Sequence, residues 1–175
     1  SEKYNNEIAL IGYAGTGKTF LISEIRKALE KLNPRIEIAF VTFTGKASSV
    51  LKQKLGYVDE GKDYIGTIHS LIYKPEFQFN KKLNRMVIVK WIKTASLNYD
   101  LIIIDEASMV SEEILNDLKS FNIPIWAVGD HGQLPPVSES SYCLMKNPDY
   151  KLEKIHRQAE GNPIIKLAER ARKYG

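Results

Sequence analysis

The sequence Gly12-Tyr13-Ala14-Gly15-Thr16-Gly17-Lys18-Thr19 stands between an apolar run and a segment with helical spacing. The apolar run, Ile8 to Ile11, suits a buried strand, and apolar residues from Leu21 to Leu32 recur as on one face of a helix. The pattern G-x-x-x-x-G-K-T in this position is typical of a loop that binds phosphate groups. Its glycines let the backbone approach an anion closely, and the N-terminus of the following helix attracts negative charge.

The last residues of this loop carry the predicted chemistry. Lys18 would reach the β- and γ-phosphates of a nucleotide, and the hydroxyl of Thr19 would hold Mg²⁺. A glycine-rich turn with a chance lysine is the alternative, and the flanking strand and helix argue against it. We expect the nucleotide to be bound by Gly12, Ala14, Gly15, Thr16, Gly17, Lys18, Thr19 and Phe20.

The bulk composition is that of one globular domain. The chain has 175 residues, of which 43% are hydrophobic and 26% charged, and no apolar stretch is long enough to span a bilayer. Cys143 is the only cysteine, which fits a reducing compartment such as the cytoplasm. The net charge of +4 gives mild support for a polyanionic partner.

Apolar runs alternate with helical patterns along the chain. This alternation predicts a mainly parallel sheet covered by helices on both faces. The expected strands are residues 8–11, 36–43, 101–104, 125–128 and 151–155. One helix is expected to end near residue 32, and four others are expected to span 46–55, 68–73, 112–121 and 164–173. Residues 57–64 are expected to form a loop.

Residues 76–91 interrupt the alternation. Phe77 and Phe79 alternate with polar residues, Asn80 to Arg85 is a polar turn region, and Met86 to Trp91 is strand-like. This pattern predicts an inserted β-hairpin.

Two strand ends carry candidate chemistry. Asp105 and Glu106 follow the apolar strand Leu101 to Ile104, and ligands of α/β sheets bind at the carboxyl ends of strands. Asp105 is placed to hold Mg²⁺ together with Thr19, and Glu106 to orient or deprotonate an attacking water. Gln133 follows another strand end and could bind a γ-phosphate or that water, although a proline-rich turn is the plainer interpretation.

Six segments, in this order, resemble motifs I, Ia, Ib, II, III and IV of superfamily 1 helicases. They are GYAGTGKT, TFTGKAS (Thr42 to Ser48), TIHSL (Thr67 to Leu71), DEASMV (Asp105 to Val110), GDHGQLPPV (Gly129 to Val137) and IHRQ (Ile155 to Gln158). DEASMV and GDHGQLPPV are most similar to the RecD-like and Dda-like branch, which moves 5′ to 3′ on single-stranded DNA. The resemblance implies a RecA-like P-loop NTPase fold and an ATP-dependent DNA helicase.

The resemblance also implies roles for individual residues. Lys18 and Thr19 would bind phosphate and metal, Asp105 would bind Mg²⁺, and Glu106 would be the catalytic base. Gln133 would sense the γ-phosphate. Arg157 would approach it as an arginine finger in cis, where a forked permanent cation stabilises transition-state charge. A surface arginine beside other charged residues is the alternative for Arg157.

Four positions match family residues that face single-stranded DNA, and a fifth position nearby departs from the family pattern. Thr44, Lys46, Thr67 and His69 suit backbone phosphates, although both threonines could be helix caps and His69 a core or surface histidine. Phe43 departs from the RecD-like pattern, which has proline there, and resembles the UvrD-like branch. Phe43 is thus a candidate stacking platform for a base, with a strand-end core residue as the alternative.

The resemblance extends to domain organisation. The hairpin at 76–91 falls where RecD-like and Dda-like enzymes carry a pin that splits the duplex, and the alternative is an ordinary solvated hairpin. Motifs V and VI are not in the sequence, so residues 1–175 are expected to be the first of two RecA-like domains. The expected partners are single-stranded DNA, duplex junctions and that second domain, in a bacterial or phage-infected cell. A small P-loop nucleotide kinase and a nucleotide-gated DNA-binding module without turnover remain alternatives.

Overall fold

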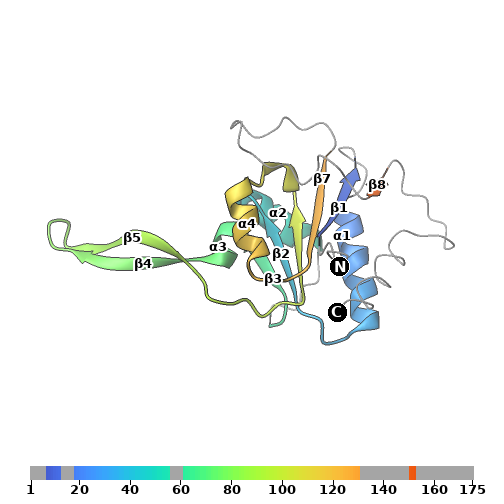
Figure 1. Ribbon diagram of the computed structural model, residues 1–175, viewed down its shortest axis with the longest axis horizontal. Coiled ribbons are helices and arrows are strands. Elements are labelled where there is room, and N and C mark those ends of the chain that lie inside the picture. The colour runs from blue at the N-terminus through green and yellow to red at the C-terminus, as the bar shows by residue number, and fades with distance from the viewer. Residues whose placement is uncertain (1–6, 13–17, 56–60, 131–149, 153–175) are drawn as a thin grey trace, which may run out of the picture.

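A six-stranded parallel sheet forms the centre of the protein (Figure 1). The computed structural model describes residues 7–12, 18–55, 61–130 and 150–152. The strands are β1 (Glu7–Gly12), β2 (Ile38–Thr42), β3 (Tyr64–Thr67), β4 (Tyr73–Asn80), β5 (Arg85–Lys93), β6 (Leu101–Asp105), β7 (Ile125–Asp130) and β8 (Tyr150–Leu152). The helices are α1 (Lys18–Leu32), α2 (Gly45–Leu55), α3 (Ile68–Ile72), η1 (Ala107–Met109) and α4 (Glu112–Lys119). The strand order in the sheet is β3-β2-β6-β7-β1-β8, and β4 and β5 pair separately.

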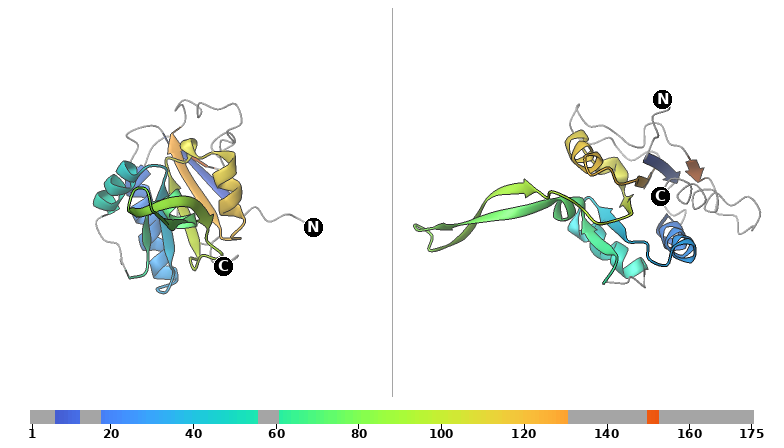
Figure 2. Two further views of the ribbon diagram at one scale, coloured as in Figure 1. Left: turned by 90° about the vertical axis from the view of Figure 1, so that its left-hand side faces the viewer. Right: turned by 60° about the horizontal axis from the view of Figure 1, so that its bottom comes forward.

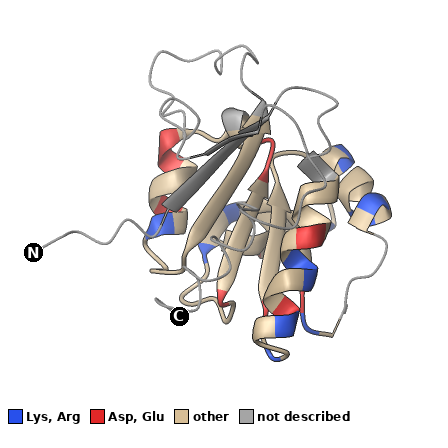
Figure 3. Ribbon diagram, turned by 90° about the vertical axis from the view of Figure 1, so that its right-hand side faces the viewer, with Lys and Arg blue, Asp and Glu red and all other residues tan. Residues whose placement is uncertain are grey.

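Helices cover both faces of the sheet, as the sequence predicted. Along β2, Ala39 and Val41 lie in a core cluster with residues of α3 and α4, whereas Ile38 and Phe40 lie in a second cluster with residues of α1 and α2. Successive strand residues point to opposite faces, so a strand buried on both sides reads as an unbroken apolar run. Figure 2 shows α4 on one side of the sheet and α1 and α2 on the other. The charged positions gather on helices and at strand ends, while the central strands are mostly uncharged (Figure 3).

Most expected elements are present with shifted ends, and one strand of the sheet was not expected. Residues 57–64 were expected to be a loop, but β3 begins at Tyr64 and pairs with β2 from Ala39↔Tyr64 to Thr42↔Thr67. This strand is short and half-buried, and it contains Gly66, so its pattern lacks the apolar run of a central strand. The expected helix at 164–173 lies outside the described residues, as does the end of the strand expected at 151–155.

A buried ion pair ties α1 to the edge of the sheet. The Arg26 Nε donates to Asp63 Oδ2 at 2.6 Å, and the other oxygen of Asp63 accepts the backbone N–H of Ile38 at 3.0 Å. Burial of a carboxylate is favourable only when its oxygens are satisfied in this way. The pair therefore fixes the helix that follows the phosphate loop against β2 and the start of β3.

The inserted hairpin is confirmed and is longer than the expected 76–91. Strands β4 and β5 are antiparallel, with a bulge between Glu76 and Phe77. The turn is closed by Asn80, whose Oδ1 accepts the N–H groups of Lys82 and Leu83 at 3.0 and 3.1 Å. The hairpin projects away from the sheet as an arm (Figure 1).

Within the described part of the chain, no helix combines the length and apolar character needed to cross a membrane.

Candidate nucleotide and nucleic-acid site

The phosphate loop connects β1 to α1. Strand β1 ends at Gly12 and helix α1 begins at Lys18, so Lys18, Thr19 and Phe20 form the first turn of the helix. The N–H groups of a first turn have no partner within the helix and attract anions. Residues 13–17, which include the predicted contacts Ala14, Gly15, Thr16 and Gly17, lie outside the described residues. The described backbone thus places a strand before the motif and a helix from Lys18 onward, as the motif requires.

Asp105 and Glu106 lie at the carboxyl end of β6. Asp105 is the last residue of the strand and is partly buried, while Glu106 is exposed. Glu106 has φ 57° and ψ 44°, a left-handed conformation that few non-glycine residues adopt, and its N–H donates to Asp105 Oδ1 at 3.1 Å. The turn leads directly into η1, where the N–H of Met109 donates to the carbonyl of Glu106 at 3.2 Å. The left-handed residue therefore ends the strand, begins η1 and leaves the Glu106 side chain exposed at the strand end.

The strand order brings the two motifs close together at the edge of the sheet that is formed by the carboxyl ends of its strands. Strand β7 lies between β1 and β6, with Gly12 opposite Asp130 and Asp105 opposite Val128. Adjacent strands are about 4.8 Å apart, so the ends of β1 and β6 are separated by about 10 Å. Gln133 and Arg157 lie outside the described residues.

The donor set at this edge suits a hard divalent cation. A carboxylate at Asp105 and a hydroxyl at Thr19 are oxygen ligands of the kind that Mg²⁺ uses together with phosphate oxygens. Among the described residues, no group of three or more His, Cys, Asp or Glu side chains is placed to hold a metal without such help.

The candidate DNA contacts lie at the same edge, after β2 and β3. Strand β2 ends at Thr42 and β3 ends at the neighbouring Thr67. Phe43, the residue after β2, is 38% exposed, which excludes the alternative that it is a core residue. Lys46 is exposed in the first turn of α2.

Thr44 and Thr67 are both helix caps, which was the alternative left open for each. The Thr44 Oγ1 accepts the N–H of Ala47 at 3.2 Å, and the Thr67 Oγ1 accepts the N–H of Ser70 at 3.1 Å. A hydroxyl can accept one hydrogen bond and donate another. Capping is therefore compatible with a phosphate contact at Thr44, whereas the Thr67 hydroxyl also bonds to Ser70 Oγ at 2.7 Å.

His69 belongs to an aromatic group at the base of the hairpin. Its ring centroid lies 4.8 Å from that of Tyr73 and 4.5 Å from that of Trp91, and the planes of the His69 and Trp91 rings are at 80° to each other. The sequence pattern did not reveal this group, because Trp91 reaches His69 only through the strand register. The three rings place the hairpin next to the strand end at Thr67.

The comparisons with known proteins agree with this architecture. A family model described as an AAA domain matches residues 2–139. The ATP-dependent RecD2 DNA helicase of Deinococcus radiodurans is 31% identical over 169 residues, which cover 92% of this chain and 21% of that protein. The RecBCD enzyme subunit RecD of Buchnera aphidicola is 35% identical over 186 residues, which cover 92% of this chain and 29% of that protein.

A solved structure shows the same fold. The crystal structure of Pif1 helicase from Candida albicans matches with a TM-score of 0.51 and 24% identity, over 87% of this chain and 37% of that chain. The chain spans less than a third of the length of each of these two curated relatives. Because the family model matches most of the sequence, this protein belongs to the AAA domain family, and its relatives there include the motor domains of RecD helicases.

Proposed function

We propose that this chain is the first RecA-like motor domain of a DNA helicase that couples ATP hydrolysis to translocation on single-stranded DNA and duplex unwinding. The observation that supports this proposal is the single sheet edge at which the phosphate loop, Asp105 and Glu106 meet the segments after β2 and β3. A motor must move DNA in response to the state of its nucleotide. Placement of both sets of residues on one rigid edge gives the shortest physical link between them.

On the nucleotide side, the first turn of α1 would receive the phosphates of ATP. Lys18 would neutralise the β- and γ-phosphates, while Thr19 and Asp105 would hold Mg²⁺. When bound, that ion supplies charge neutralisation at the transferring phosphate. Glu106 would accept the proton of the attacking water. Its left-handed backbone directs the following residues into η1 and keeps the carboxylate at the exposed edge.

Gln133 and Arg157 complete the proposed site on the strength of the motif resemblance. Gln133 would bond the γ-phosphate, and Arg157 would stabilise the transition-state charge. A second RecA-like domain would supply the other half of the ATP cleft, so that each cycle of binding and hydrolysis opens and closes the two domains. This chain by itself should then hydrolyse ATP weakly.

On the DNA side, the contacts would be independent of sequence. Thr44, Lys46, Thr67 and His69 would bind the backbone of a single strand, and Phe43 would stack on a base. The hairpin would act as a pin that separates the strands of a duplex, with cationic residues at its tip against the DNA backbone. By resemblance, movement would be 5′ to 3′, in the cytoplasm of a bacterial or phage-infected cell.

The test is ATP hydrolysis by the complete protein that carries this chain, with and without single-stranded DNA. We expect strong stimulation by DNA and a loss of at least about 100-fold in kcat in Glu106→Gln, because a general base contributes that much or more. Nucleotide affinity should persist in this variant. Glu112→Gln, on the exposed surface of α4, is the matched control and should behave as the parent protein.

Two outcomes would contradict the proposal. Hydrolysis that is indifferent to DNA would favour a P-loop nucleotide kinase. Nucleotide-dependent DNA binding with no turnover in any variant would favour a binding module.

A further inference from the structure

One carboxylate on α4 holds both strands of the hairpin at its root. Tyr73 begins β4, Lys93 ends β5, and the two residues face each other in the strand register. The Tyr73 hydroxyl donates to Oδ2 of Asp117, and the Lys93 Nζ donates to Oδ1 of Asp117 at 3.2 Å. We name these three residues the root clamp.

Neighbouring groups reinforce the clamp. The Lys93 Nζ also donates to Ser120 Oγ at 3.1 Å, and it lies 5.9 Å from the centroid of the Phe121 ring. The hydrogen bond from Tyr73, followed by Lys93, holds the pKa of Asp117 below its usual value. Burial, and then the hydrogen bond to Asp117, raises the pKa of Tyr73 to about 12. The phenol therefore remains the donor and the carboxylate the acceptor at neutral pH.

Helix α4 is a rigid base for this clamp. Leu115 and Leu118 are buried in the same core cluster as strand residues of β6 and β7. Ser111 caps the helix, with its Oγ accepting the N–H of Ile114 at 3.4 Å, and η1 connects this cap to Glu106 at the strand end. The clamp thus joins the hairpin to an element that packs directly on the strands of the candidate nucleotide site.

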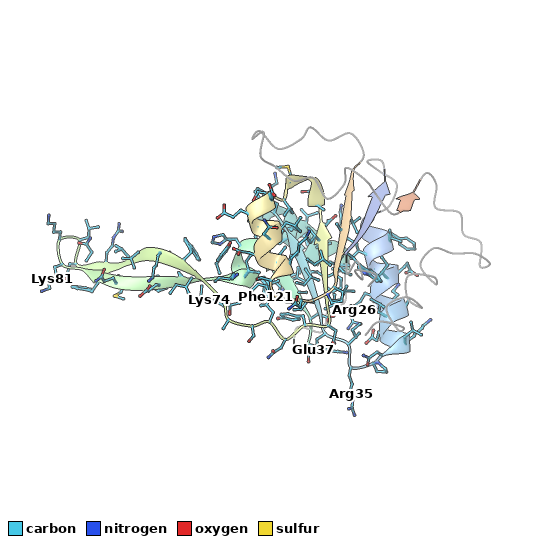
Figure 4. The ribbon with its side chains drawn as sticks, in the orientation of Figure 1. Arg26, Arg35, Glu37, Lys74, Lys81 and Phe121 are labelled. Carbon is cyan, nitrogen blue, oxygen red and sulfur yellow. The ribbon has the colours of Figure 1, made fainter. Side chains whose placement is uncertain are left out.

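The hairpin needs such a base, because it stands away from the rest of the protein. Figure 4 shows Lys81 at the far end of the arm and Phe121 on the body, at the side where the arm begins. An isolated two-stranded ribbon is only marginally stable in water. Eight strand residues at about 3.3 Å each span about 26 Å, so a turn of about 10° at the root moves the tip by about 4–5 Å. The contacts at the root therefore decide where the tip stands.

Aromatic rings also hold the root of the hairpin. His69, Tyr73 and Trp91 form the aromatic group described above, and Tyr73 belongs to both that group and the root clamp. Ring contacts resist separation but allow sliding, whereas a carboxylate with two directed donors resists rotation.

We propose that Asp117 is a positioning residue for duplex separation, which fixes the direction of the hairpin relative to the motor body. The functional half of this inference rests on the proposed role of the hairpin as a pin. The structural half, that Asp117 sets the direction of the arm, can be tested in this chain alone.

The structural test measures the distance between the tip and the body by pulsed electron spin resonance. Spin labels are placed at Lys82→Cys and Lys31→Cys in a Cys143→Ser background, since Cys143 is the only native cysteine. We expect a narrow distance distribution in the parent chain and one at least about twice as wide in Asp117→Ala. The control is Glu112→Gln, which changes an exposed carboxylate on the same helix. This variant should leave the distribution narrow. If Asp117→Ala unfolds, Tyr73→Phe combined with Lys93→Met removes the same donors from the hairpin side.

The functional test uses the complete protein and compares unwinding with hydrolysis. Asp117→Ala should lower the unwinding rate on forked DNA about tenfold while ATP hydrolysis stimulated by single-stranded DNA stays within about twofold. Asp117→Glu, which keeps the carboxylate, should recover part of the unwinding rate. An unchanged distance distribution, or unchanged unwinding despite a widened distribution, would overturn the proposal. Deletion of Asn80 to Arg85 separates the causes, because a normal unwinding rate after that deletion would mean that the hairpin is not a pin.

Discussion

At the scale of single residues, Glu106 combines a proposed catalytic role with an unfavourable backbone. Its φ of 57° costs a residue with a Cβ about 1–2 kcal/mol relative to glycine, which adopts this region freely. Glu106→Gly should therefore raise the free energy of unfolding by about 1 kcal/mol over Glu106→Ala, while both variants lose the proposed base. Urea unfolding of the two variants measures this difference.

The alanine variant is the control because it removes the same side chain and keeps the Cβ. If Glu106→Gly is less stable than Glu106→Ala, the strand end stores no strain at this residue. In either case hydrolysis by the complete protein should fall in both variants, so that stability and activity change independently.

Residue identities at the strand ends could be predicted from the sequence, but their conformations could not. The motif order pointed to Asp105 and Glu106, yet nothing local in the sequence indicates a left-handed glutamate. Similarly, Thr44 and Thr67 each allowed a cap or a ligand contact, and only the structure shows that both are caps. These backbone conformations and hydrogen bonds depend on the path of the chain after each strand, and three-dimensional packing determines that path.

At the scale of elements, the hairpin has two chemically different faces. One face pairs Phe77 with Ile88 and Phe79 with Met86, all about half exposed. The other face carries the ion pair between Glu76 and Lys90, with an Nζ–Oε2 distance of 2.9 Å. Cross-strand pairs of these kinds stabilise a ribbon that has few other contacts. Cations are concentrated in a third place, the tip, where Lys81, Lys82 and Arg85 are all exposed.

Removal of the tip cations should weaken the salt dependence of DNA binding. Each phosphate contact contributes about 0.7–0.9 to the slope of log K against log salt. The triple variant Lys81→Ala, Lys82→Ala, Arg85→Ala should therefore lower the slope on forked DNA by about 2, as measured by fluorescence anisotropy across a salt series.

A triple variant at the other end of the protein has the same change in charge. Lys27→Ala, Lys31→Ala and Arg35→Ala lie at the end of α1 and just beyond it, and Figure 4 shows Arg35 far from Lys81. Equal slopes for the two triple variants would mean that the tip cations do not contact DNA.

The hairpin could be predicted from the sequence, whereas its attachment could not. Alternating apolar residues around a polar turn are a local signal, so residues 76–91 were identified correctly as a hairpin. Asp117, by contrast, is 44 positions away from Tyr73. The contact exists because α4 and the hairpin root pack on the same face of the sheet, and no spacing within either segment encodes it. The edge strand β3 was missed for a related reason, since its pairing with β2 substitutes for an apolar pattern of its own.

At the scale of the whole molecule, the doubly covered sheet followed from the sequence because the central strands are buried on both faces. Trp126 and Val128 point into one core cluster, while Ile125 and Ala127 point into the other. Every position of such a strand must be apolar, and that run is visible without any knowledge of partners. Because this doubly covered sheet forms one cooperative unit, a ligand bound at the carboxyl ends of its strands stabilises the entire unit.

Nucleotide binding should therefore raise the melting temperature of this chain even if it hydrolyses ATP weakly. A ligand present at about 100 times its dissociation constant adds about 2.7 kcal/mol to the free energy of unfolding. For a domain of this size that energy corresponds to a rise of about 5–10 °C, measurable by differential scanning fluorimetry. Lys18→Ala should abolish the rise. Asp105→Asn and chelation of Mg²⁺ by EDTA should each reduce it, and together they should reduce it no further than EDTA alone, because the substitution acts only through the metal that EDTA removes. Additive losses would mean that Asp105 stabilises the nucleotide complex by a route other than the metal. A melting temperature that is unchanged by MgATP would mean that this chain does not bind the nucleotide.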